Sequence, residues 1–355
     1  MHTRGFFAMK IKKIFATAAM ALATLGSSAV WANNQDPVRV FYYSLNDMYI
    51  NQLSTSLQDL AIGSGIKIAQ FDAQDDLMRQ ASQIQTALSV NKKKTPILVN
   101  PVDNQNGLNA LRAAKQQNVP IIFFNRKPTQ EALSSYKDAW YVGSNINQAG
   151  YYQASLVIEA LKQHPEIDRN KDGYINYVIL KGEPSHVDTA ARSNVFVRTM
   201  LDAGIKLKPV AIASGQWSPS VAQNEMTRII SEKGIASIEL IVSNNDAMAL
   251  GAIKSLQAVG YNNPDVPNSQ FIPVFGIDAI PSALEAIERG VMTGTVLNDY
   301  KATADVMIRM AKAYIDGQPI TEDLIGYPIK NCTIEIPYSP IYNFNLGTAA
   351  AETKK

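Results

Sequence analysis

Cysteine is almost absent from this sequence, since Cys332 is the only one among 355 residues. An intrachain disulfide is therefore excluded, even though exported chains of an oxidising compartment often use such bonds. The cysteine also lies far from the N-terminal region, so it does not mark a lipid anchor there. At this length the chain can form two domains of ordinary size, each with its own core.

Long apolar runs are also scarce, and the clearest one lies near the N-terminus. There the basic segment "MKIKK" precedes the apolar "IFATAAMALATLG", and "VWA" then ends at Ala32. This order predicts a cleaved signal peptide over residues 1–32, because the apolar run is too short for a membrane anchor. No later stretch is long enough to span a bilayer. We therefore expect an exported, soluble periplasmic protein that begins at Asn33.

The sequence also lacks a large net charge of either sign. The whole chain has 33 basic and 31 acidic residues, and the predicted signal peptide contains no acid and four of the bases, Arg4, Lys10, Lys12 and Lys13. Removing those four leaves 29 basic and 31 acidic residues, a net charge of −2. A balance this even gives no reason to expect a nucleic-acid partner.

The remaining sequence alternates apolar segments of strand length with longer amphipathic segments. Helical periodicity is clear in "DDLMRQASQIQTALSV" (75–90) and "NEMTRIISEKG" (224–234). The alternation predicts parallel sheets covered by helices on both faces. Ten strands are many for one sheet, so two α/β domains in tandem are the more economical arrangement. The strand-like segments are 38–44, 67–73, 95–101, 119–126, 139–145, 175–182, 208–215, 238–245, 272–279 and 292–298.

Ligands of open α/β sheets lie outside the carboxyl ends of the strands, so the residues at those ends are the candidate site. Here they are rich in Asp, Asn, Arg and aromatic residues, with no nucleophile beside a base. This mixture suits a sugar, because planar polar groups bind neighbouring hydroxyls in pairs and flat rings cover the C–H faces. The residues are Tyr43, Asp47, Tyr49, Asn125, His186, Asp188, Arg192, Trp217, Asn245, Asp246, Asp278 and Asn298.

Several of these residues have an ordinary structural explanation. Asp188 and Arg192 are an i,i+4 pair, which taken alone favours a salt bridge on a helix surface. Asn245, Asp246 and Asp278 lie just before predicted helices, so each could be an N-cap. Their common placement at strand ends nevertheless favours one binding site over separate structural roles.

The segment "DRNKDGYIN" (168–176) matches the first nine positions of a calcium-binding loop. Such a loop requires a bidentate glutamate at its twelfth position, which here is Ile179 in a strand-like segment. The residues alone leave open a coincidence, half a site, or a site completed from elsewhere in the chain. The candidate ligands are the side chains of Asp168, Asn170, Asp172 and Asn176 and the carbonyl of Tyr174, with Gly173 at the sharp turn.

Five motifs, in order along the chain, resemble those of the periplasmic galactose/glucose-binding proteins: "FFNRKP", "LKGEPSHVDTAAR", "VSNNDAMALGA", "VFGIDA" and "GTVLND". The similarity covers essentially the whole chain after the predicted signal peptide. It implies a type I periplasmic binding protein, with two doubly wound parallel-sheet domains joined by three crossings and the ligand in the cleft. The implied domains are 33–144 with 298–334, and 145–297 with 335–355, the second containing the calcium loop.

The same resemblance implies roles for individual residues. Glu239, on a distant strand, would complete one structural Ca²⁺ site formed by the loop, and Tyr49 and Trp217 would stack on the sugar. The implied partners are D-galactose or D-glucose, the permease of a sugar ABC transporter and, in some bacteria, a chemoreceptor; a monomer is expected. The implied polar contacts to the sugar come from Asp47, Asn125, His186, Asp188, Arg192, Asn245, Asp278 and Asn298.

The expected function is thus high-affinity capture of a hexose without chemistry, and three other functions fit parts of the pattern. Among binding proteins, the alternative is one for a different monosaccharide, such as a pentose. A secreted glycosidase could use two of Asp47, Asp188 and Asp278, but no sequence feature marks one carboxylate as an acid in an apolar pocket. The sugar-sensing half of a repressor is rejected by the export signal and by the lack of a helix-turn-helix before the first strand.

Overall fold

The computed structural model describes residues 36–92, 94–267 and 269–344, so the predicted signal peptide lies outside the described residues. From Asp36 on, the described residues belong to one compact unit that contains two sheets. Each of the ten predicted strand segments contains a strand of one of these sheets. Among the described residues, no helix combines the length and the apolarity needed to cross a bilayer.

The first sheet has seven strands in the order β11-β12-β5-β4-β3-β1-β2. Neighbouring strands are parallel except for the hairpin of β11 and β12. The strands are β1 (Val38–Tyr42), β2 (Ile68–Asp72), β3 (Ile97–Val99), β4 (Ile121–Phe124), β5 (Ala139–Ser144), β11 (Ile329–Lys330) and β12 (Thr333–Ile336).

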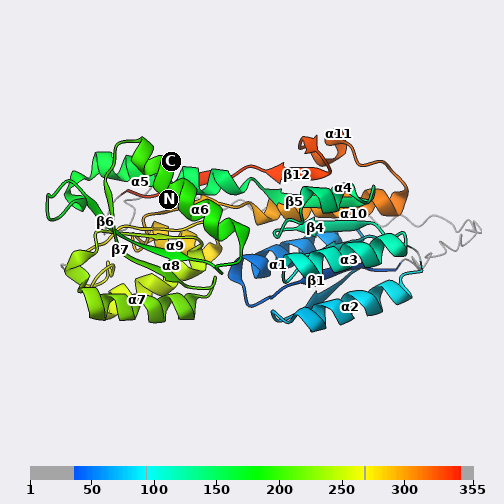
Figure 1. The fold of residues 1–355 in the computed structure, drawn as a ribbon, viewed down its shortest axis with the longest axis horizontal. Coiled ribbons are helices and arrows are strands. Elements are labelled where there is room, and N and C mark those ends of the chain that lie inside the picture. The colour runs from blue at the N-terminus through cyan, green and yellow to red at the C-terminus, as the bar shows by residue number, and fades with distance from the viewer. Residues whose placement is uncertain (1–35, 93, 268, 345–355) are drawn as a thin grey trace, which may run out of the picture. The chain divides into compact units, whose positions relative to one another are not determined.

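Helices cover both faces of this sheet, because alternate residues of a strand point to opposite faces. Tyr42 and Phe124 face the core that includes α1 (Met48–Gly63) and α10 (Tyr300–Asp316), whereas Phe41 and Phe123 face the opposite core. That second core is formed with α2 (Leu77–Val90), α3 (Asn104–Gln116) and α4 (Gln130–Ser134) (Figure 1). The short helix α11 (Glu322–Ile325) follows α10.

The second sheet has six strands in the order β13-β10-β9-β8-β6-β7, and only β13 runs antiparallel to its neighbour. Its strands are β6 (Ile175–Lys181), β7 (Leu207–Ser214), β8 (Leu240–Ser243), β9 (Val274–Phe275), β10 (Gly294–Leu297) and β13 (Ser339–Tyr342). Its helices are α5 (Ile146–Gln163), α6 (Val187–Asp202), α7 (Pro219–Lys233), α8 (Asp246–Ala258) and α9 (Pro281–Glu288), with the 3₁₀ turns η1 (Pro165–Ile167) and η2 (Ile235–Ser237).

Each sheet and the helices that cover it are termed a lobe. The chain passes from one lobe to the other at three places. The first crossing follows β5 at Ser144, and the second follows β10, after which α10 packs against α1 of the first lobe. The third lies between β12 of the first sheet and β13 of the second. The predicted fold class, two parallel-sheet α/β domains of the type I binding-protein kind, is confirmed. The exact sequence limits proposed for each domain stay predictions.

Candidate functional site

A cavity lies where the carboxyl ends of the strands of the two sheets face each other. It is lined by nine of the ten residues predicted to contact a sugar, together with Tyr43 and Arg126. Both lobes contribute, which is why residues as far apart in sequence as Asp47 and Asp278 meet. The nine predicted residues are Asp47, Tyr49, Asn125, His186, Asp188, Arg192, Trp217, Asn245 and Asp278.

In the first lobe, Asp47 is held by both of its carboxylate oxygens. Oδ1 accepts a hydrogen bond from the Ile50 amide at 3.0 Å and so caps α1, while Oδ2 accepts from the Tyr43 hydroxyl at 2.6 Å. Asn125 follows β4 with φ at 60°, a left-handed conformation that asparagine tolerates better than most residues. These two residues present fixed oxygen and amide groups to the cavity.

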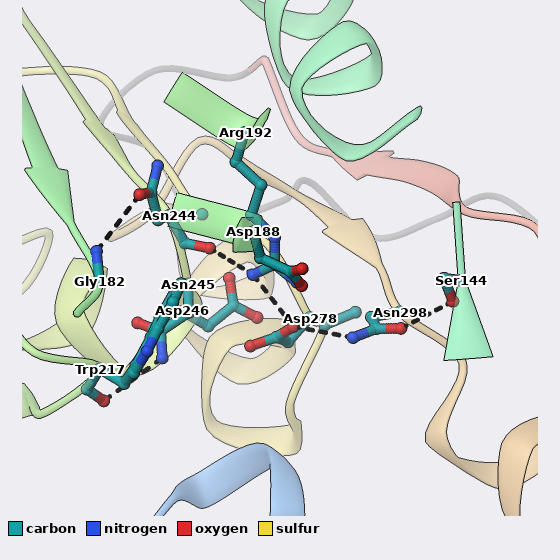
Figure 2. Close-up of polar contacts among 12 residues, drawn as sticks. Ser144, Gly182, Asp188, Arg192, Trp217, Asn244, Asn245, Asp246, Asp278 and Asn298 are labelled. Atoms are coloured by element: carbon teal, nitrogen blue, oxygen red, sulfur yellow. Dashed lines mark hydrogen bonds and ion pairs between the residues drawn. The ribbon is translucent and has the colours of Figure 1, made fainter. Parts of the chain in front are cut away.

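In the second lobe, the guanidinium of Arg192 organises a buried polar cluster (Figure 2). Nη1 donates to the Asn244 carbonyl at 2.6 Å and lies 3.9 Å from Asp278 Oδ1, and Nη2 donates to Asp188 Oδ2 at 3.4 Å. Both Asp188 and Arg192 are buried, at 6% and 4% exposure, so the alternative of an exposed surface salt bridge is wrong. The Nε–H of Arg192 is a buried donor with no hydrogen-bond partner among the described residues.

The electrostatics of this cluster follow from burial and from the Arg192 charge. Burial raises the pKa of the Asp278 carboxyl to about 7, although the Arg192 guanidinium opposes that rise. Asp246, at the start of α8, is wholly buried, and burial together with the nearby Asp278 raises its pKa well above the ordinary value. Asp246 does not line the cavity. Instead its Oδ2 accepts from the Ile280 amide at 3.1 Å and thereby supports the turn that presents Asp278.

The N-cap alternative is correct for one residue of the three. Asn245 is the N-cap of α8, where its Oδ1 accepts from the Met248 amide at 2.9 Å, and it lines the cavity as well. Asp246 is the first residue of that helix, and the N-cap of α9 is Ile280, not Asp278. A capping role and a place in the site are therefore compatible for Asn245.

Aromatic rings bound the cavity from both lobes. Trp217 follows β7 with φ at 59°, its ring lies edge-on to His186 at 5.4 Å, and Arg192 lies 5.6 Å from its centre. Tyr49 lies on α1 and packs edge-on against Tyr300 at 6.3 Å. The two rings are held by neighbouring side chains, so they offer fixed flat surfaces.

Two residues differ from what the sequence indicated. Asn298, although predicted as a contact, does not line the cavity; its Nδ2 donates to Asp278 Oδ1 at 3.3 Å, and its Oδ1 accepts from the Ser144 hydroxyl at 3.1 Å (Figure 2). Arg126 lines the cavity without having been assigned to it, whereas Tyr43 was a strand-end candidate and lines it as expected. A signal for Arg126 was present, because it is the neighbour of Asn125 after β4.

The loop 168–176 is folded around the Glu239 carboxylate. Oε1 of Glu239 accepts from the Arg169 amide at 2.9 Å, and Oε2 accepts from the amide and side-chain nitrogens of Asn176 at 2.8 and 2.9 Å. Gly173 has φ at 78°, as the sharp turn requires, and Asp168 Oδ1 is a buried oxygen without a partner among the described residues.

This donor set suits a hard cation such as Ca²⁺, since it consists of carboxylate, amide and carbonyl oxygens. In the part of the chain that the structure describes, however, no three His, Cys, Asp or Glu side chains are gathered closely enough to count as a metal group. The loop thus fits the ion in its chemistry and its turn, and the geometry of coordination stays a prediction.

Two α/β lobes linked by three crossings, with a polar and aromatic cavity between them, define a two-lobed ligand-binding protein. A family model for the periplasmic binding protein domain matches residues 38–319. The chain therefore belongs to the periplasmic binding protein family, and the resemblance inferred from the motifs is confirmed.

Individual relatives agree with this assignment. The chain is 32% identical over 340 residues to the D-galactose/methyl-galactoside binding periplasmic protein MglB of Haemophilus influenzae, covering 96% of this chain and 99% of that protein. A solute-binding protein from Bacillus halodurans, solved with bound myo-inositol, has a TM-score of 0.68 at 25% identity and covers 87% of this chain and 94% of its own. A solute-binding protein from Actinobacillus succinogenes, solved with bound D-allose, has a TM-score of 0.71 at 22% identity. The match covers 86% of this chain and 98% of that chain.

Gly182 sets the position of the Trp217 ring, because a Cβ at this glycine would lie 2.0 Å from the ring atom Cζ2. We expect Gly182→Ala to push the ring into the cavity and to weaken binding of D-glucose, the sugar expected from the sequence, by roughly tenfold or more. Gly63→Ala is the matched control, since no atom lies within 4 Å of a Cβ there. Equal affinities for the two variants, measured by titration calorimetry, would contradict this role.

His186 gives the folded chain an acid-sensitive stability. Burial lowers the pKa of its imidazole to about 4, so the folded state keeps it neutral where an unfolded chain, with a pKa near 6.5, takes up a proton. This contribution is complete only well above pH 6.5 and is lost as the pH falls towards 4. At pH 4.5 the loss of unfolding free energy is about 2.5 kcal/mol.

His186 caps α6 through its Nδ1, which accepts from the Asp188 amide at 3.1 Å. His186→Asn replaces this acceptor with an amide oxygen that can also cap the helix, and it removes the titration. In urea unfolding at pH 7.5 and 4.5, we expect the acid-induced loss of free energy to be smaller in the variant than in the wild type. An unchanged difference would show that other groups cause the acid sensitivity.

Proposed function

We propose that this chain binds D-galactose and D-glucose in the periplasm for delivery to the permease of a sugar ABC transporter, without chemistry. The observation that carries the proposal is the cavity between the lobes, in which carboxylates, amides, a guanidinium and two aromatic rings converge. Family membership and a relative named for D-galactose support it. Contact with a chemoreceptor and a monomeric state belong to the same proposal.

Each residue of the cavity contributes to sugar recognition according to its chemistry. Asp47, Asp188 and Asp278 accept hydrogen bonds from hydroxyls, and Arg192 donates to hydroxyl or ring oxygens through its free Nε–H. Asn125 and Asn245 do both, while Tyr49 and Trp217 cover the apolar faces of the ring. Because the polar groups are fixed and buried, a sugar that leaves one of them unpaired loses about 1–3 kcal/mol.

A secreted glycosidase is the second candidate, because a carboxyl with a pKa of about 7, such as that of Asp278, is what an acid catalyst requires. Against it, Asp278 accepts from Asn298 and faces Arg192, and its turn is supported by Asp246. These contacts serve to present an acceptor. The relatives named above are binding proteins. Incubation with a nitrophenyl galactoside separates the two candidates, since release of nitrophenol would favour the enzyme.

The test of the proposed function is a panel of monosaccharides followed by tryptophan fluorescence. We expect saturable signals for glucose and galactose, which differ only at C4, because the Asp47 carboxylate accepts from a hydroxyl in either orientation. Mannose should bind at least tenfold more weakly, because inversion at C2 leaves buried polar groups unpaired. Asp47→Ala should cost more affinity than Tyr49→Phe. Tighter binding of ribose or mannose than of both hexoses would reject this specificity and favour a different monosaccharide.

We further propose that the loop binds one structural Ca²⁺ through Asp168, Asn170, Asp172, the Tyr174 carbonyl, Asn176 and Glu239. Glu239→Gln should lower the bound calcium measured by atomic absorption more than Asn176→Ala does, because it removes a charge. A chelator should lower the thermal midpoint but leave sugar binding at room temperature. Equal calcium contents in the wild type and Glu239→Gln would contradict the role of Glu239.

A further inference from the structure

An ion pair joins the two lobes outside the three crossings. Arg126 follows β4 of the first sheet and Glu183 follows β6 of the second. Nη2 of Arg126 lies 3.0 Å from Oε1 and 3.3 Å from Oε2 of Glu183. The side chains are 9% and 26% exposed, so the pair is only partly screened by water.

The other side-chain hydrogen bonds that join the lobes within the described residues lie at the crossings, such as Ser144 with Asn298 and Asn145 with Glu335. Contacts of that kind persist when a hinge opens, because the crossing residues stay near the axis of motion. The Arg126–Glu183 pair instead joins the loops that follow β4 and β6, so opening the cleft between these loops separates its two members.

Contacts within the first lobe hold the Arg126 side chain in place. Its guanidinium lies 3.8 Å from the centre of the Tyr43 ring, and its Nη1 donates to the Val102 carbonyl. The hydroxyl of that same Tyr43 donates to Asp47 Oδ2 at 2.6 Å. The ring that supports Arg126 therefore also fixes a carboxylate of the sugar site.

The pair also borders two concave spaces, the cavity described above and a groove outside it. Arg126 and His186 line both the cavity proposed for the sugar and an outer groove of about 400 Å³. Glu183 lines only the outer groove. The ion pair consequently lies where the cavity borders the outer groove.

We propose that Arg126 and Glu183 form the closing contact of the ligand site, an ion pair made when the lobes meet over the sugar. This inference rests on the proposed function. The pair increases sugar affinity mainly by slowing release, because breaking a partly buried charge pair is part of opening the cleft. Through Tyr43 the same contact couples closure to the Asp47 carboxylate.

The experiment is a double-mutant cycle of Arg126→Gln, Glu183→Gln and the double variant, with release of glucose and galactose followed by stopped-flow fluorescence. We expect each single variant to release sugar about tenfold faster than the wild type. The double variant should release sugar at about the same rate as each single variant, because either change already removes the pair. Arg289→Gln and Asp265→Asn are the matched controls. They break an ion pair of 2.7 Å that lies within the second lobe alone, and they should leave release unchanged.

Release rates that multiply in the double variant, or singles that release sugar at the wild-type rate, would overturn the proposal. So would an equal fall of the thermal midpoint with and without sugar, because the closing contact should stabilise only the sugar-bound state. Failure of the wild type to bind either hexose would instead contradict the proposed function. The same cycle, run with whichever monosaccharide or polyol does bind, then still decides whether the pair closes the site.

Discussion

The buried guanidinium of Arg192 is the interaction on which the site depends. A buried charge is costly unless it is paired and hydrogen-bonded, and Arg192 achieves this with Asp188, Asp278, the Asn244 carbonyl and Tyr338. Burial disfavours the charge, but Tyr338, Asp278 and Asp188 raise the pKa of the guanidinium beyond its ordinary value. Because these partners come from separate elements, the charge fixes their relative positions and leaves Nε–H for a ligand.

Local backbone strain is the second constraint. Asn125, Trp217 and Asp278 each follow a strand with positive φ, at 60°, 59° and 121°, and such conformations cost about 1–3 kcal/mol apiece. Each turns a side chain into the cavity instead of along the strand. The surroundings hold the strained turns in place, since Asp246 accepts from the Ile280 amide beyond Asp278 and Trp217 packs on Gly182. Residues outside the cavity therefore determine its shape.

Sequence periodicity predicted the ten main strands, because β-strands with both faces buried read as apolar runs between helical segments. It missed β11, β12 and β13, which pair at or near sheet edges and contain exposed residues, so their sequences are not continuous apolar runs. Nine predicted contacts line the cavity because strand ends of parallel sheets meet at one edge. Periodicity could not tell that the helix face of Asp188 and Arg192 is buried, since that depends on how α6 packs within its lobe and on distant partners such as Asn244.

Hydrogen bonds also connect the polar cluster to each of the three crossings. A ligand in the cavity is thereby coupled to the crossings, which form the hinge between the lobes. Asp278 contacts Asn298 at the second crossing, and Asn298 contacts Ser144 at the first, while Arg192 Nη2 donates to the hydroxyl of Tyr338 at the third. A sugar that draws on Asp278 and Arg192 must therefore perturb groups bonded to all three connections. Closure sensed at the crossings and secured between the lobes by Arg126 and Glu183 would make the cleft respond to its ligand as one unit.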